Sequence, residues 1–86
     1  MYAIQFTSGA HDDLQAFPVG EQKRIVAMLE THLMHNPAVE SPQRKRLEGG
    51  GLHGWQFRSG GIRVFYAVDA ENQVVRIEAI GKSFQL

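Results

Sequence analysis

The 86-residue chain contains no cysteine, only three prolines and one tryptophan, and no long run of apolar residues. Without cysteine, neither a disulfide framework nor a zinc–thiolate site can form. The segment Met1–Phe6 alternates like a strand and lacks the basic lead and long apolar stretch of a signal peptide. We therefore expect a cytoplasmic protein that neither spans nor enters a membrane.

Net charge is also absent, because nine Lys and Arg residues balance nine Asp and Glu residues. This balance argues against the strong basic field of a protein that binds nucleic acid indiscriminately. The two parts of the chain differ, however. Residues 1–43 carry two basic and five acidic side chains, a net charge of −3, and residues 44–86 carry seven basic and four acidic ones, a net charge of +3. The C-terminal half can therefore contribute a positive face.

The first half of the chain shows the patterns of one strand followed by two helices. Tyr2–Thr7 alternates with period two, which predicts a strand. Ser8 can cap a short first helix that Pro18 ends. Pro18 also suits the opening of a second helix, whose apolar stripe runs to the stop signal His35–Pro37. We expect a loop over Asn36–Arg46.

The second half changes to the pattern of strands. Three stretches rich in aromatic and β-branched residues, 55–58, 62–68 and 74–80, are separated by two turn signals. They predict a three-strand antiparallel meander. The 43% hydrophobic content suits one globular domain, residues 1–86, of α+β class with both helices packed on one face of the sheet.

The strand at 62–68 carries apolar groups on both of its faces. Val64 and Tyr66 point one way, and Arg63 and Phe65 point the other way. Because only one face can meet the helices, the other would be a partly apolar, partly cationic surface, which calls for a partner or ligand. We interpret Tyr66 as a packing residue.

Several local signatures, in their order and spacing, resemble one known group of proteins. The most informative runs from Gly54 to Val68, and the others are Ala10–Leu14, Asn36–Pro37, Leu47–Gly49 and Ile80–Lys82. Together they resemble the RelE/ParE superfamily of bacterial toxins nearly end to end. The resemblance implies the RelE-like β-α-α-β-β-β fold. It also implies that the chain is the toxin of a type II toxin–antitoxin system and that a cognate antitoxin neutralises it in a hetero-oligomer.

Members of the RelE branch cut messenger RNA on the ribosome, by attack of a ribose 2′-hydroxyl on the adjacent phosphate. This chemistry needs a base, cations at the phosphoryl oxygens and an acid for the departing 5′-oxygen, but implies no metal or other cofactor. Arg63 matches the arginine that the family places beside the scissile phosphate, and Arg58 matches a basic position on the preceding strand. Lys82 would assist them, and His53 is a candidate proton carrier. The alternative for either arginine is a surface ion pair, for example with Glu78.

Three further residues are candidates for RNA binding. Lys45 and Arg46 belong to a basic tripeptide that can steer RNA or antitoxin acids, although such a segment is usually only solvated. Phe84 can stack on a base but cannot donate a proton. Well-known relatives carry lysines where this chain has Gln56 and its neighbours, and related members carry a catalytic glutamate where it has Lys45.

The missing base and acid leave alternatives to an mRNA interferase. One is a ParE-like inhibitor of DNA gyrase, which acts without catalysis. Another is a degenerate member that retains only antitoxin binding. All three hypotheses share the fold and the antitoxin partner.

Overall fold

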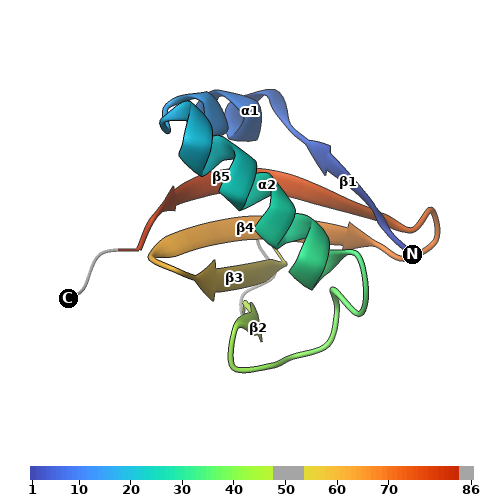
Figure 1. Ribbon diagram of the computed structural model, residues 1–86. Helices are drawn as coiled ribbons and strands as arrows, with labels where there is room; N and C mark the ends of the chain where they lie inside the picture. Colours follow the sequence, from blue (N-terminus) through green and yellow to red (C-terminus); the bar gives the residue numbers. More distant parts are fainter. Residues whose placement is uncertain (48–53, 84–86) are drawn as a thin grey trace.

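The computed structural model describes residues 1–47 and 54–83, which form two helices and five strands (Figure 1). The strands make one mixed sheet in the order β1-β5-β4-β3-β2, in which β1 runs parallel to β5 and the other neighbours are antiparallel. No helix in these two ranges is long and apolar enough to cross a membrane. The elements are β1 (Ala3–Phe6), α1 (Ser8–Gln15), α2 (Val19–Leu33), β2 (Arg44–Arg46), β3 (Trp55–Ser59), β4 (Ile62–Asp69) and β5 (Val74–Lys82).

The two helices begin close to the expected residues. Thr7, rather than Ser8, caps α1, because its Oγ1 accepts a hydrogen bond from the Ala10 N–H at 3.1 Å. Pro18 directly precedes α2, as expected, where its missing N–H costs nothing. The apolar stripe of α2 buries its side chains against the sheet, and these are Ile25, Leu29 and Leu33.

The expectation of a loop over residues 36–46 is wrong for residues 44–46, which form β2, a three-residue strand at the edge of the sheet. Lys45 lies opposite Gln56 of β3 in an antiparallel ladder. The outer edge of β2 is covered by the chain before it: the Arg44 N–H donates to Ser41 Oγ and the Arg46 N–H to Glu40 Oε2, each at 3.1 Å. An edge strand whose donors are already bonded is a poor template for pairing with other chains.

The three strands of the second half are antiparallel neighbours, as expected, but they belong to a larger sheet. They extend one or two residues beyond the expected ends. The register between β4 and β5 shifts at Phe65 and Tyr66, which face Ala79 and Ile77, so Glu78 is an extra residue. The resulting bulge allows both Ile77 and Ile80 to be buried in spite of their odd spacing.

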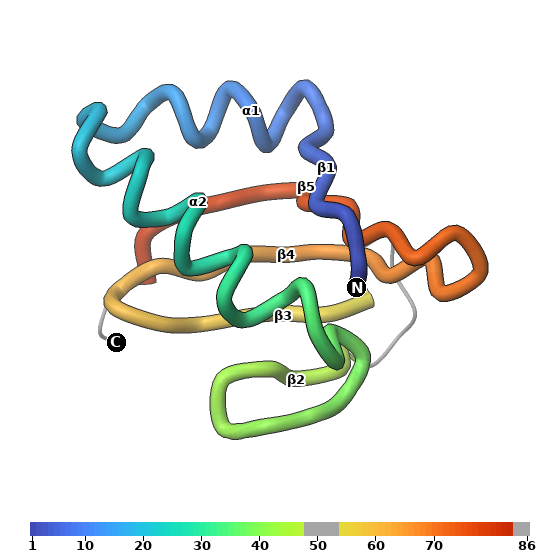
Figure 2. Tube along the Cα trace, turned by 45° about the vertical axis from the view of Figure 1, so that its right-hand side comes forward, coloured from blue at the N-terminus to red at the C-terminus, as the bar shows by residue number. Residues whose placement is uncertain are grey.

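The core lies between the helices and one side of the sheet. In Figure 2, α1 lies along β5 and α2 crosses the sheet, with the His32 ring of α2 5.0 Å from the Phe57 ring of β3. At its centre Tyr66 is fully buried, and its hydroxyl donates to the Pro37 carbonyl at 2.7 Å. Burial raises the pKa of Tyr66 well above its ordinary value. The buried apolar residues are Ala10, Phe17, Ile25, Leu29, Leu33, Trp55, Phe57, Val64, Tyr66, Val75, Ile77 and Ile80.

Candidate nucleic-acid interface

Arg58 and Arg63 lie directly opposite each other on β3 and β4. The Arg58 N–H donates to the Gln43 carbonyl before β2 at 3.0 Å, so Arg58 and Arg63 form a pair without mutual backbone hydrogen bonds. In such a pair the Cα atoms are about 4.5 Å apart and the side chains are close. Their strand neighbours Phe57 and Val64 are buried in the core, so alternation directs both arginines to the opposite side, here called the outer face.

Neither arginine has an acidic partner among residues 1–47 and 54–83. Arg58 is exposed, and its Nη2 donates to the Ser83 hydroxyl at 2.6 Å. Arg63 is half-buried, and its buried Nε has no hydrogen-bond acceptor in the described part of the chain. Glu78, which sequence alone offered as a partner for either, pairs instead with Arg76 at 3.5 Å. Like charges opposite each other in a sheet are unfavourable unless an anion lies between or beside them.

The basic tripeptide of β2 is divided between the two faces of the sheet. Arg44 turns to the helix side, where its Nε donates to the Val39 carbonyl at 2.9 Å and its Nη1 to the His32 carbonyl at 3.1 Å. A cation there also suits the negative end of α2. Arg46 turns the same way, since its guanidinium carbon lies 6.0 Å from the centroid of the Trp55 ring. Only Lys45, which is exposed, points to the outer face.

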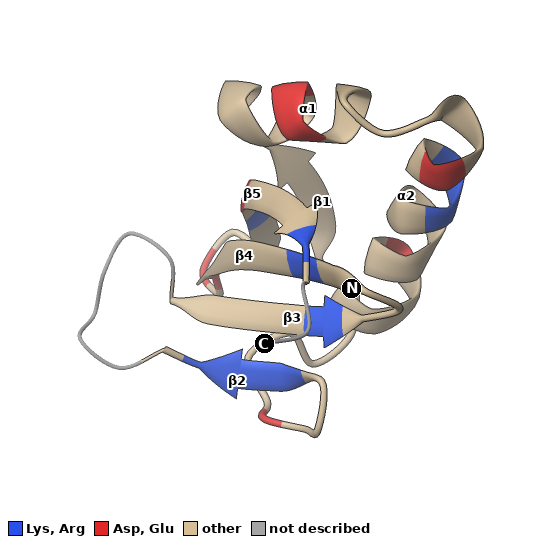
Figure 3. Cartoon of the chain, turned by 90° about the vertical axis from the view of Figure 1, so that its left-hand side faces the viewer, with Lys and Arg blue, Asp and Glu red and all other residues tan. Residues whose placement is uncertain are grey.

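Lys82 starts on the other face from Arg58 and Arg63. It lies opposite Ile62, which packs against the core, whereas its neighbour Gly81 lies opposite Arg63. Lys82 is exposed at the end of β5. The structure therefore brings together Arg58, Arg63 and Lys45 on neighbouring strands, and Figure 3 shows these basic segments side by side. His53 and Phe84 lie outside the described residues.

Comparison with known proteins identifies the fold through solved structures. No protein-family model and no curated sequence matches the chain. The toxin–antitoxin complex RelBE2 from Mycobacterium tuberculosis contains a chain of 25% identity, with a TM-score of 0.81 over 94% of this chain and 90% of that one. The isolated Escherichia coli RelE toxin is 20% identical, with a TM-score of 0.68 over 100% of this chain and 88% of that one. This chain is RelE-like.

A third structure extends the comparison to an archaeal complex. A chain of the RelE–RelB complex from Pyrococcus horikoshii is 22% identical, with a TM-score of 0.75 over 99% of this chain and 98% of that one. The resemblance that the sequence motifs indicated is thus confirmed across nearly the whole RelE-like chain.

The RelE-like chain has one feature that sequence reasoning missed, at the turn between β3 and β4. Here a hollow of about 200 Å³, called the turn hollow, opens beside the Arg58 guanidinium. Ser83 closes it from the end of β5, because its N–H donates to the Gly61 carbonyl at 2.7 Å. A serine after the last strand carries no signal that could have indicated this. The lining residues are Arg58, Ser59, Gly60, Gly61, Ile62 and Ser83.

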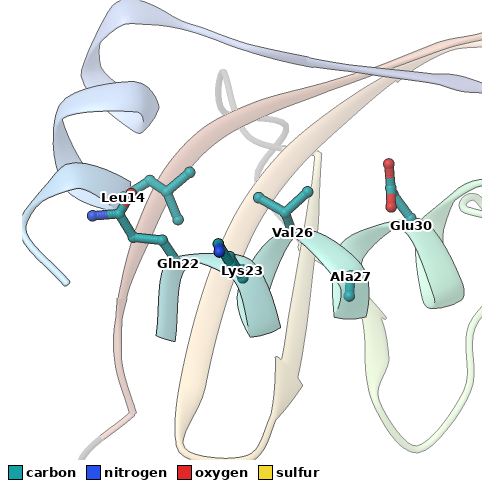
Figure 4. A pocket seen from close by; sticks show the side chains of 6 residues that line it. All are labelled: Leu14, Gln22, Lys23, Val26, Ala27 and Glu30. Carbon is teal, nitrogen blue, oxygen red and sulfur yellow. The ribbon is translucent and has the colours of Figure 1, made fainter. Parts of the chain in front are cut away.

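A second hollow, of about 350 Å³, lies between the helices of the RelE-like fold, away from the arginines. Leu14 of α1 and five side chains of α2 line it (Figure 4). Its floor is apolar, with Leu14 and Val26, and its rim carries one charge of each sign, Lys23 and Glu30. A neutral, partly apolar hollow offers no chemistry for a phosphate group.

Proposed function

We propose that the chain is the toxin of a type II toxin–antitoxin system and that it cleaves messenger RNA on the ribosome in the cytoplasm. The observation that carries the proposal is the Arg58–Arg63 pair on the outer face of a RelE-like fold, without an acid partner in the described ranges. Two guanidinium groups on one rigid hairpin suit the phosphate backbone of RNA, because each can contact two oxygens at once.

The partner that we propose is a cognate antitoxin. Its support is that similar chains were solved in toxin–antitoxin complexes from Mycobacterium tuberculosis and Pyrococcus horikoshii. An antitoxin that covers the outer face would also satisfy the arginines and withdraw them from RNA. The resulting assembly would be a toxin–antitoxin hetero-oligomer.

In the proposed reaction, Arg63 neutralises the charge that builds on the phosphoryl oxygens, and Arg58 contributes a second cation beside it. A fixed guanidinium needs little rearrangement as the charge develops, and removal of one such donor typically lowers kcat about 10²–10³-fold. Lys45 would hold the backbone of the message nearby. Lys82 and Arg46, which start on the helix side, would contribute only by reaching around the edge of the sheet.

The experiment is induced expression in a bacterium, with measurement of protein synthesis and mapping of RNA 5′ ends. The wild-type chain should stop translation and produce new message ends, and Arg63→Ala should abolish both. Arg24→Gln is the matched control, because Arg24 is an exposed cation on α2. Continued translation with double-strand DNA breaks would indicate a gyrase inhibitor instead, and harmless expression would indicate a degenerate toxin. Either result would refute the ribonuclease.

A further inference from the structure

The turn hollow combines several groups that bind anions and that the rest of the molecule leaves available. Only one hydrogen bond of the Arg58 guanidinium is formed within the described residues, to the neutral hydroxyl of Ser83 at 2.6 Å. A guanidinium has five N–H donors, so most of its donors face solvent. Arg58 is therefore held in place without being neutralised.

The turn residues that line the hollow also carry backbone donors without acceptors in the described residues. Gly60 and Gly61 have φ angles of +57° and +81°, as a two-residue type I′ turn requires. Their N–H groups donate to no acceptor in residues 1–47 or 54–83. Within residues 1–47 and 54–83, no atom would lie within 4 Å of a Cβ at either position. Unbonded N–H groups beside a guanidinium suit a tetrahedral oxyanion.

Arg63 does not line this hollow. The guanidinium of Arg58 is drawn toward Ser83, past the turn, whereas Arg63 lies opposite Gly81 on β5. A Cβ at Gly81 would also meet no atom of the described residues within 4 Å, so none of them fills the space beside Arg63 on that flank. The two cations thus serve two neighbouring positions, and a nucleic-acid backbone carries one negative charge on each successive phosphate.

We propose that the turn hollow binds a second phosphodiester group of the RNA, adjacent to the one at Arg63, and that Ser83 positions the Arg58 guanidinium for it. This inference rests on the proposed function and refines it: Arg58, described above as a second cation beside the reacting phosphate, binds the next phosphate of the same RNA. Ser83 is a positioning residue: its N–H fixes it to the Gly61 carbonyl and its hydroxyl orients Arg58.

The test is the salt dependence of binding between the full chain and a short, labelled single-stranded RNA, measured by fluorescence anisotropy. For single strands, the slope of log K against log salt is about −0.7 for each phosphate contacted. Arg58→Gln and Arg63→Gln should each make the slope about 0.7 shallower, and the double variant about 1.4 shallower. Arg24→Gln should leave it unchanged.

A second pair of variants tests Ser83 without changing the charge. Ser83→Ala should weaken RNA binding about two- to tenfold, because the Arg58 side chain must then be ordered upon binding. The slope should stay the same. Ser83→Thr, which keeps the hydroxyl, should restore the affinity. Equal losses in Ala and Thr variants would remove Ser83 from this role.

The possible outcomes distinguish failure of the second phosphate site from failure of the proposed function. If the wild-type chain shows no salt-dependent RNA binding, the second phosphate site is overturned, whereas the function is overturned only if the translation assay also fails. If it binds but Arg58→Gln has the wild-type slope, or the double variant matches Arg63→Gln, only the second phosphate site is overturned. If inorganic phosphate at matched ionic strength displaces the RNA, the hollow takes a free anion. If Arg58→Gln loses affinity for poly-glutamate but not for RNA, it takes carboxylates. Each of these two results also overturns the site.

Discussion

Removal of the Tyr66 hydroxyl should weaken the fold by an amount that the structure allows us to work out. In Tyr66→Phe the ring stays in the core, but the buried Pro37 carbonyl loses the hydrogen bond of 2.7 Å that it accepts. A buried acceptor left without a donor costs about 1–3 kcal/mol. For a domain of this size that corresponds to a fall in Tm of about 4–8 °C for each kcal/mol.

The assay is urea unfolding followed by the fluorescence of the single tryptophan. Trp55 is buried and stacks near Tyr66, with ring centroids 6.2 Å apart, so its emission reports on this part of the core. Tyr2→Phe is the control, because Tyr2 is half-buried and its hydroxyl has no hydrogen bond in the described residues; it should change stability by less than about 0.5 kcal/mol. Equal midpoints for Tyr66→Phe and wild type would refute the reasoning.

The stability difference between Tyr66→Phe and wild type should also change in alkaline solution. Burial raises the pKa of Tyr66 above its ordinary value of 10.0, so the folded state keeps this proton where the unfolded state loses it. The stability that the protonated Tyr66 hydroxyl contributes is therefore fully present below pH 10 and is lost as the pH rises above that value. Tyr66→Phe has no such proton, so its disadvantage relative to wild type should shrink above pH 10. A constant difference would show that the hydroxyl is not buried.

Three further changes test other parts of the structure. Asp13→Ala removes the carboxylate that accepts from the Ile80 N–H at 3.0 Å, and should cost about 1–3 kcal/mol in thermal melting, whereas the exposed Asp12→Ala should cost little; equal losses would contradict this. Gly61→Ala forces a Cβ into a φ of +81° and should cost about 1–2 kcal/mol in urea unfolding; no loss would mean a different turn. Glu40→Ala should speed hydrogen exchange of the Arg46 N–H, and unchanged exchange would place that donor elsewhere.

Most of the fold follows from local sequence patterns. Period-two alternation located β1, aromatic and β-branched content between turn signals located β3, β4 and β5, and Pro18 marked the boundary between the helices. The sequence could not predict β2, because Arg44–Arg46 has no apolar alternation and its strand form depends on the backbone of β3 and on Glu40. Nor could it indicate that β1 joins β5 in parallel, since that pairing connects the two ends of the chain.

The sequence predicted which site residues pair across strands, because the turn sets the register, but it did not predict the face of the sheet on which each side chain of β2 lies. The Gly60–Gly61 turn sets the register that places Arg58 opposite Arg63. Lys45 and Arg46 are neighbours in the sequence, and the basic tripeptide predicts the same RNA-binding role for both, but strand alternation directs them to opposite faces. Ser83 acquires its position only through contacts with Gly61 and Arg58, 22 and 25 residues earlier.

The parallel pairing of β1 with β5 delays completion of the sheet during synthesis. Hydrogen bonds join Thr7 to the Glu78 carbonyl and the Ile80 N–H to Asp13, across 71 and 67 residues of sequence. The chain must lose the entropy of closing these long loops before the stabilising contacts can form, so folding should be slow for a chain of this length. On a ribosome, the apolar sides of β1 and α1 remain uncovered until nearly the last residue of β5 has been made. A growing chain therefore lacks a complete sheet, and a closed core beneath it, until β5 has been made.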